Sequence, residues 1–271
     1  MLGPLLQAVR QAHPLIHCIT NTVTINDCAN ILLAAGVSPI MADAPEEAAE
    51  ITAHSQGLTL NLGTLHAGRI PAMLASGRQA NRMGIPAVLD PVGAGVSAFR
   101  AETARRLLAD VHFAVIRGNL SEIQALSGGD GHACGVDAGD SLTPQTMDAA
   151  LDLARQLAHR TGAVVAVTGE TDLVTDGKTA YCIHNGHPMM RSVTGTGCQL
   201  SCLTAAFAAA SPGRVLQAAA AAVCAMGLCG ETAYARLSPA DGNAAYRDRI
   251  LDAVYRLTPA RLEEGARYEL R

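Results

Sequence analysis

The sequence is poor in aromatic residues and in clustered positive charge. Its 271 residues include 3 Phe, 5 Tyr and no Trp, and the formal net charge is −4. Binding of single-stranded nucleic acid needs aromatic stacking platforms, and binding of a phosphate backbone needs clustered Lys and Arg. The composition therefore predicts that nucleic acid is not a partner.

Paired cysteines and long apolar spans are lacking too. The 8 Cys residues include no C-x-x-C pair and no zinc-finger spacing, so we interpret them as reduced and mostly buried thiols. Residues 1–10 lack the charged start and apolar run of a signal peptide. The uncharged stretches 199–213 and 215–230 are shorter than the roughly 20 residues of a membrane span. We expect buried core helices, no membrane partner and a cytoplasmic location.

Short apolar runs alternate with helical patterns along the whole chain, which predicts one α/β domain over residues 1–271. Such alternation gives a mostly parallel central sheet with helices on both faces. The strands are expected at 15–19, 38–41, 58–62, 87–89, 113–116 and 163–167. A hairpin is expected at 173–183, around Asp176-Gly177. The helices are expected at 7–12, 23–35, 45–54, 71–83, 101–109, 121–126, 144–160, 198–210, 214–234 and 244–257, with Pro45 at a first helical position.

In open α/β sheets ligands bind beyond the carboxyl ends of the strands. The segments that follow the predicted strands are all polar or rich in glycine: 20–21, 41–42, 61–64, 90–95, 117–119 and 168–170. This pattern is typical of one ligand-binding rim.

Two common nucleotide-binding motifs are missing, the G-x-x-x-x-G-K-[ST] loop and the G-x-G-x-x-G turn. A different device is predicted at residues 193–198, where a glycine turn at Gly195, Thr196 and Gly197 precedes an apolar helix. Successive N–H groups and the helix dipole would form an anion hole there. The alternative is an ordinary loop-to-helix turn.

Cys198 follows this turn at the start of the helix. The helix dipole favours an anion at that place, so the sequence predicts a bias toward thiolate. Such a thiolate could accept a proton from an attacking hydroxyl. The alternative is an inert buried Cys.

Two acids, Asp90 and Glu122, follow neighbouring strands. Mg²⁺ in phosphoryl transfer is often held by one or two carboxylates, and Arg117 could neutralise phosphate charge. Glu122 also lies three residues after Asn119, the spacing of a capping box at a helix start. A capping role and a metal-binding role can coexist.

Other features receive no functional role. His184 and His187 lie in a loop with no acid nearby in the sequence, so we interpret them as surface or structural residues. The mixed charge of residues 261–271 is typical of a solvated helix end, and the Gly-rich loop at residues 128–139 matches no useful motif.

Together these residues resemble the hydroxyethylthiazole kinase family of the ribokinase-like group, from about residue 5 to about residue 260. Most of the wider group carries Asp where this sequence has Cys198. The motifs, in order, are His17-Cys18-Ile19-Thr20-Asn21, Ser38-Pro39-Ile40-Met41, Asn61-Leu62-Gly63-Thr64, Asp90-Pro91-Val92-Gly93, Arg117-Gly118-Asn119-x-Ser121-Glu122-Ile123, Val167-Thr168-Gly169-Glu170-x-Asp172 and Gly195-Thr196-Gly197-Cys198.

The resemblance implies a ribokinase-like fold and transfer of the γ-phosphate of ATP to the primary alcohol of 4-methyl-5-(2-hydroxyethyl)thiazole. It implies that Met41 and Gly195 contact the thiazole, with Asn21 close by, and that Cys198 is the base. It also implies a homotrimer with active sites shared between subunits.

For the co-substrate, the resemblance implies that Arg117 and Thr168 contact ATP, and that Asp90 and Glu122 hold Mg²⁺ with its waters. Three rivals stay open on the residues alone. They are a kinase of the same fold acting on hydroxymethylpyrimidine or pyridoxal, a non-catalytic binding protein, and an ATP-dependent dehydratase.

Overall fold

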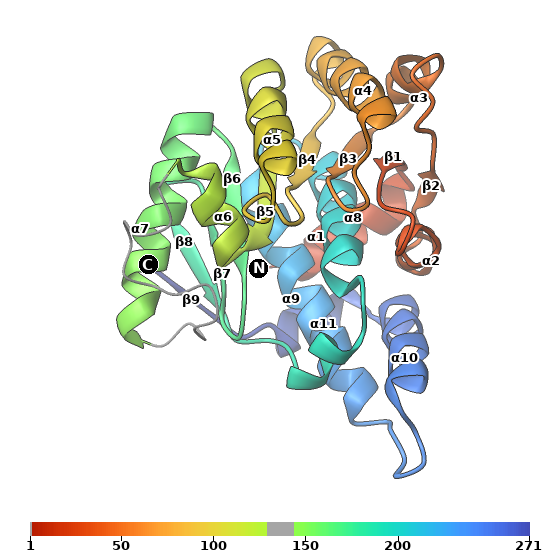
Figure 1. The fold of residues 1–271 in the computed structure, drawn as a ribbon. Coiled ribbons are helices and arrows are strands. Elements are labelled where there is room, and N and C mark those ends of the chain that lie inside the picture. The colour runs from red at the N-terminus through yellow and green to blue at the C-terminus, as the bar shows by residue number, and fades with distance from the viewer. Residues whose placement is uncertain (1, 129–143) are drawn as a thin grey trace.

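The structure, a computed structural model, describes residues 2–128 and 144–271. Within these residues nine strands form one sheet (Figure 1). They are β1 (Leu15–Ile19), β2 (Ser38–Ile40), β3 (Gly57–Asn61), β4 (Ala87–Asp90), β5 (Val115–Asn119), β6 (Val164–Thr168), β7 (Asp172–Thr175), β8 (Ala180–Ile183) and β9 (Tyr268–Leu270). Their order across the sheet is β2-β1-β3-β4-β5-β6-β7-β8-β9.

Helices connect the strands and cover both faces of the sheet. They are α1 (Gly3–Ala12), α2 (Ile25–Ala35), α3 (Ala48–His54), α4 (Ile70–Met83), α5 (Ala98–Asp110), α6 (Leu120–Leu126), α7 (Pro144–Thr161), α8 (Thr196–Ala209), α9 (Val215–Tyr234), α10 (Asn243–Arg256) and α11 (Pro259–Gly265), with the short 3-10 turns η1 (Ala67–Arg69) and η2 (Pro188–Ser192).

The strands from β2 to β6 pair in parallel, which confirms the predicted fold class. β7, β8 and β9 extend the sheet as antiparallel strands. The predicted hairpin joins β7 to β8, and the side chain of Asp176 accepts hydrogen bonds from the N–H groups of Lys178 and Thr179. Gly177 has φ 93°, which is the left-handed conformation that such a turn needs.

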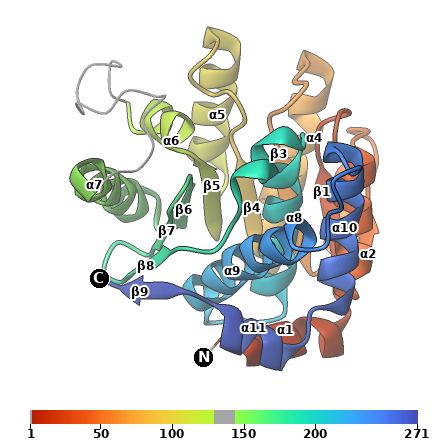
Figure 2. The ribbon, with the colours of Figure 1, turned by 90° about the horizontal axis from the view of Figure 1, so that it is seen from below.

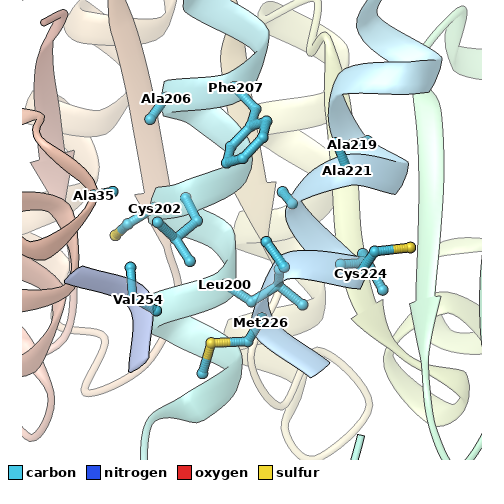
Figure 3. Close-up of a cluster of buried hydrophobic side chains, with 14 of the residues drawn as sticks. Ala35, Leu200, Cys202, Ala206, Phe207, Ala219, Ala221, Cys224, Met226 and Val254 are labelled. Atoms are coloured by element: carbon cyan, nitrogen blue, oxygen red, sulfur yellow. The ribbon is translucent and has the colours of Figure 1, made fainter. Parts of the chain in front are cut away.

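Two apolar cores lie on the two faces of the sheet. One is formed by α1, α2, α8, α9 and α10, and the other by α3 to α7 (Figure 2). In the first core, small side chains such as Ala219 and Ala221 let α8 and α9 pack closely around Phe207 (Figure 3). By length and composition α9 would suffice to cross a membrane, but 72% of its apolar window is buried inside the protein. Burial of both α8 and α9 confirms the core helices predicted at these positions.

Three local predictions were wrong. α1 begins at Gly3 rather than at residue 7, because the N–H groups of Leu2 and Gly3 both donate to the Glu263 carboxylate. Pro45 is not a helical residue, since the Ala44 carbonyl accepts from two later N–H groups in a turn and α3 starts only afterwards.

The third concerns the C-terminus, where residues 261–271 are not a solvated helix end. α11 stops at Gly265, and β9 then adds an edge strand beside β8. The rings of Tyr181 and Tyr268 pack 5.1 Å apart across this pair. The Gly-rich loop predicted at 128–139 lies, apart from Gly128, outside the described residues.

Candidate active site

The polar segments predicted as a rim lie together at the carboxyl ends of the parallel strands. β3, β4, β5 and β6 end at Asn61, Asp90, Asn119 and Thr168, and the register pairs Asn61 with Asp90 and Asn119 with Thr168. Asn21 follows β1, two residues beyond its end. The N-terminus of α8 faces this rim, because the side chain of Ser201 on α8 donates to Asp90 at 2.8 Å.

Cys198 lies in the first turn of α8 and is 9% exposed. Its sulfur accepts hydrogen bonds from the side-chain amides of Asn21 and Asn61, each at 3.2 Å. Burial, followed by the nearby charge of Asp90, raises the pKa of the Cys198 thiol to about 11. The predicted bias toward thiolate is therefore wrong for the free chain, since desolvation outweighs the helix dipole.

Asp90 is fully buried, and its two carboxylate oxygens differ in their hydrogen-bond partners. Oδ2 accepts from Asn61 Nδ2 and Ser201 Oγ, both at 2.8 Å. Oδ1 has no hydrogen-bond partner and lies 3.6 Å from Nη1 of Arg117. Burial raises the pKa of Asp90 to about 6, although Arg117 opposes this effect. An unpartnered buried oxygen fits a ligand atom for a divalent cation or for one of its waters.

Glu122 forms the predicted capping box at the start of α6, together with Asn119. Its two oxygens accept from the N–H groups of Gly93 and Asn119, at 2.9 and 2.8 Å. Each oxygen keeps a lone pair, and the charge of Glu122 contributes to the raised pKa of Asp90. Across residues 2–128 and 144–271, no group of three or more His, Cys, Asp or Glu side chains could hold a metal. The unpartnered Oδ1 of Asp90 and the remaining lone pairs of Glu122 fit a cation that keeps most of its waters, as Mg²⁺ does.

The glycine turn before α8 has a demanding backbone geometry. Gly195 caps the helix with φ 87°, and a Cβ there would overlap the side chain of Thr24. A Cβ at Gly197 would lie 2.5 Å from Nη1 of Arg117. The first turn of α8, whose N–H groups have no partner within the helix, therefore lies beside the Arg117 guanidinium, and both kinds of donor could bind an anion.

A cavity of about 640 Å³ opens beside this turn. Four predicted site residues line it, namely Arg117, Thr168, Thr196 and Gly197. Arg117 donates to Thr168 Oγ1 at 2.6 Å, which fixes the guanidinium at the cavity wall. The size of the cavity suits a nucleotide, and Arg117 beside Gly197 suits phosphates placed toward α8.

Sequence reasoning missed the outer wall of this cavity, which comprises residues 184–188 with Met190, Val223 and Met226. Glu231 on α9 fixes the wall by accepting from the N–H of Gly186 at 2.7 Å and from Arg267. The N–H of Arg267 in turn donates to the Asn185 side chain at 2.8 Å. These partners are 36 to 82 positions apart in the chain, so no local pattern could indicate them.

The two discounted histidines both line this cavity. His184 is not without an acid, because its Nε2 lies 3.6 Å from Glu269 of β9. His187 stacks on Tyr234 with ring centroids 3.5 Å apart. Asp172 ends the motif Val167-Thr168-Gly169-Glu170-x-Asp172, and no role was predicted for it. It also lines the cavity, and burial raises its pKa to about 7 against the lowering effect of the Gly169 N–H and Arg117.

Met41 follows the edge strand β2 and does not line the cavity. The loop that carries it is held by His17, whose Nε2 donates to the carbonyl of Ala42 at 2.6 Å. Burial lowers the pKa of His17. Asn21 and Cys198 are joined by a hydrogen bond at 3.2 Å, and neither lines the cavity.

Comparisons with known proteins give the family and the fold of this chain. The model of the "Hydroxyethylthiazole kinase family" matches residues 6–260. Hydroxyethylthiazole kinase of Clostridium acetobutylicum is 50% identical over 271 residues, with 99% of each chain covered. The structure of a hydroxyethylthiazole kinase protein from Pyrococcus horikoshii OT3 is 34% identical with a TM-score of 0.89, covering 100% of this chain and 98% of that one.

A ribokinase-like superfamily protein from Enterococcus faecalis has a TM-score of 0.62 at 11% identity, covers 93% of each chain and shares the fold alone. The ribokinase-like fold and the family expected from the motifs are both confirmed: the chain belongs to the hydroxyethylthiazole kinase family.

Proposed function

We propose that this chain transfers the γ-phosphate of ATP to the primary hydroxyl of 4-methyl-5-(2-hydroxyethyl)thiazole. The observation that carries the proposal is the position of the Cys198 sulfur. Cys198 directly follows Gly197, which lines the nucleotide-sized cavity. Its sulfur accepts hydrogen bonds from Asn21 and Asn61 of the polar rim. Family membership supports the substrate, and the residues support the reaction type.

On the ATP side, Arg117 and Thr168 bind the phosphates at the cavity wall. Gly195, Thr196 and Gly197 form the anion hole, whose N–H groups stabilise the charge on the equatorial oxygens during transfer. The transition state is loose, so positioning and charge neutralisation provide most of the rate.

Asp90 and Glu122 hold Mg²⁺ and its waters in this proposal. The unpartnered Oδ1 of Asp90 supports that assignment. Asp90 and Glu122 would hold the ion, and the chemistry that it would supply is neutralisation of phosphate charge.

On the acceptor side, Met41, Gly195 and Asn21 bind the thiazole, and Cys198 is the base that takes the hydroxyl proton late in the transfer. Because the pKa of Cys198 is about 11, the reactive thiolate is a minor species at neutral pH. Residues 1–271 form one kinase domain. The chain acts in the cytoplasm as a homotrimer in which two subunits share each thiazole site.

Transfer from labelled ATP tests the proposal, with Mg²⁺ and one of four acceptor conditions: the hydroxyethylthiazole, hydroxymethylpyrimidine, pyridoxal or none. A labelled product with the thiazole alone supports both substrate and reaction. A product with another acceptor contradicts the substrate, and ATP consumption without a phosphorylated product would favour a dehydratase. No turnover in any arm would favour a binding protein. Sedimentation of the same sample gives the oligomeric state.

A further inference from the structure

Asn61 is fully buried at the end of β3, between Asp90 and Cys198, and uses all of its hydrogen-bonding capacity. Its Oδ1 accepts from the N–H of Gly63 at 2.8 Å and from Asn21 Nδ2 at 3.0 Å. Its Nδ2 donates to Asp90 Oδ2 at 2.8 Å and to Cys198 Sγ at 3.2 Å. Two donors and two acceptor lone pairs are all that an amide offers.

The orientation of this amide follows from its neighbours. The backbone N–H of Gly63 can only donate, so the atom facing it is Oδ1, and Nδ2 therefore faces the Asp90 carboxylate. Asn21 is oriented in the same way, because its Oδ1 accepts from the N–H of Thr24 at 3.1 Å. Both amides consequently direct an N–H at the Cys198 sulfur, which acts as an acceptor toward each.

We propose that Asn61 is a positioning residue for phosphate transfer. The two N–H bonds of its amide hold the Cys198 sulfur and the Asp90 carboxylate in a fixed relation. This inference rests on the proposed function for its catalytic meaning. The hydrogen bond to Asp90 fixes the plane of the amide, so that its second N–H stays aimed at the sulfur. Two N–H donors favour negative charge on that sulfur as the acceptor hydroxyl loses its proton.

Ser201 provides a matched control. It donates to the same Asp90 oxygen at the same distance of 2.8 Å, and its other hydrogen bond goes to the carbonyl of Gly197. Ser201→Ala therefore removes one donor from Asp90 and leaves both amide donors to Cys198 in place. Asn61→Ser is the change at Asn61 that adds no charge: its hydroxyl is too short to reach both Asp90 and Cys198, whereas Asn61→Asp would add a negative charge beside both groups.

The test measures alkylation of Cys198 by iodoacetamide at pH 8.5, in protein free of metal and substrates. Mass spectrometry separates this thiol from Cys202 on the same tryptic peptide. We expect Asn61→Ser to slow alkylation at least about tenfold, the effect of losing one hydrogen bond to a charged group. Ser201→Ala should stay within about threefold of the parent rate. Equal alkylation rates in Asn61→Ser and the parent chain, or equal slowing by Ser201→Ala, would overturn the proposal.

Thermal unfolding shows whether Asn61→Ser is folded. If it is not, Asn61→Thr takes its place, because its hydroxyl is equally short and its methyl group fills more of the space, and the same alkylation results support or overturn the proposal. In the transfer assay, Asn61→Ser should lower kcat about 10- to 100-fold while KM for ATP changes less than about threefold. A rise in KM for ATP with unchanged kcat would contradict a positioning role. Since alkylation needs no substrate, it reports on Asn61 even if the chain phosphorylates none of the acceptors.

Discussion

Replacing Asp90 by Asn is expected to make the protein more stable and at the same time inactive. The pKa of Asp90 is about 6 in the folded chain against an ordinary value of 3.8, and each unit corresponds to about 1.4 kcal/mol. The ionised carboxylate at pH 8 therefore costs about 3 kcal/mol of folding free energy. An Asn oxygen can still accept from Asn61 and Ser201, so Asp90→Asn removes that cost while it keeps both hydrogen bonds.

The sign of the pH dependence follows from the raised pKa. Between pH 4 and pH 6 the folded state binds the Asp90 proton more tightly than the unfolded state, so stability falls as pH rises through this window. The advantage of Asp90→Asn should accordingly be absent near pH 4 and complete above about pH 6.5. For a chain of this size, about 3 kcal/mol corresponds to an increase in Tm of about 5 to 10 °C.

Thermal unfolding in EDTA at pH 8 and pH 4.5 measures this difference without a contribution from bound metal. The transfer assay measures the cost to function, which we expect to exceed about 100-fold because the unpartnered Oδ1 is lost. A variant that is less stable than the parent at pH 8, or whose gain is the same at both pH values, would refute the reasoning. An active variant would refute the metal assignment.

Three further predictions concern the start of α8 and of α6. Cys198→Ala should slow turnover about 10²- to 10⁴-fold, and near-normal turnover would eliminate the base role. In the parent chain the rate should rise between pH 7 and 9, because the pKa of the Cys198 thiol is about 11, and the variant should lack this rise. Gly197→Val should abolish transfer and weaken binding of a fluorescent ATP analogue, because its Cβ would lie 2.5 Å from Arg117; unchanged binding would contradict the anion hole. Asn119→Ala should lower the free energy of unfolding by about 1 kcal/mol in urea titration through loss of the helix cap; no loss would mean that the capping box does not stabilise α6.

The rim of the site was predictable because the end of each strand is a local property of the sequence. Each buried apolar run ends in a polar residue, and parallel strands bring those ends to one edge. Asn61 and Asp90 are 29 positions apart in the chain yet are register partners in the sheet. The capping box at Asn119 and Glu122 is more local still, since both partners lie within one turn.

The ionisation state of Cys198 and the outer wall of the cavity were not predictable. The helix dipole can be inferred from sequence, but burial to 9% exposure depends on how α8 packs against the sheet. The wall depends on Glu231 and Arg267, which approach residues 184–186 only when α9 and the C-terminal strand are in place. Mixed charge near the C-terminus gave no indication of such a strand.

The central position of α8 has a consequence for synthesis of the protein. This helix carries Cys198 and Ser201, and it also packs between α2 and α9 and against β3 and β4 (Figure 3). The parallel strands are complete by Thr168, so much of one apolar sheet face has no cover until α8 and α9 have left the ribosome. Covering that face and assembling the reaction centre therefore both wait for the same helix, α8.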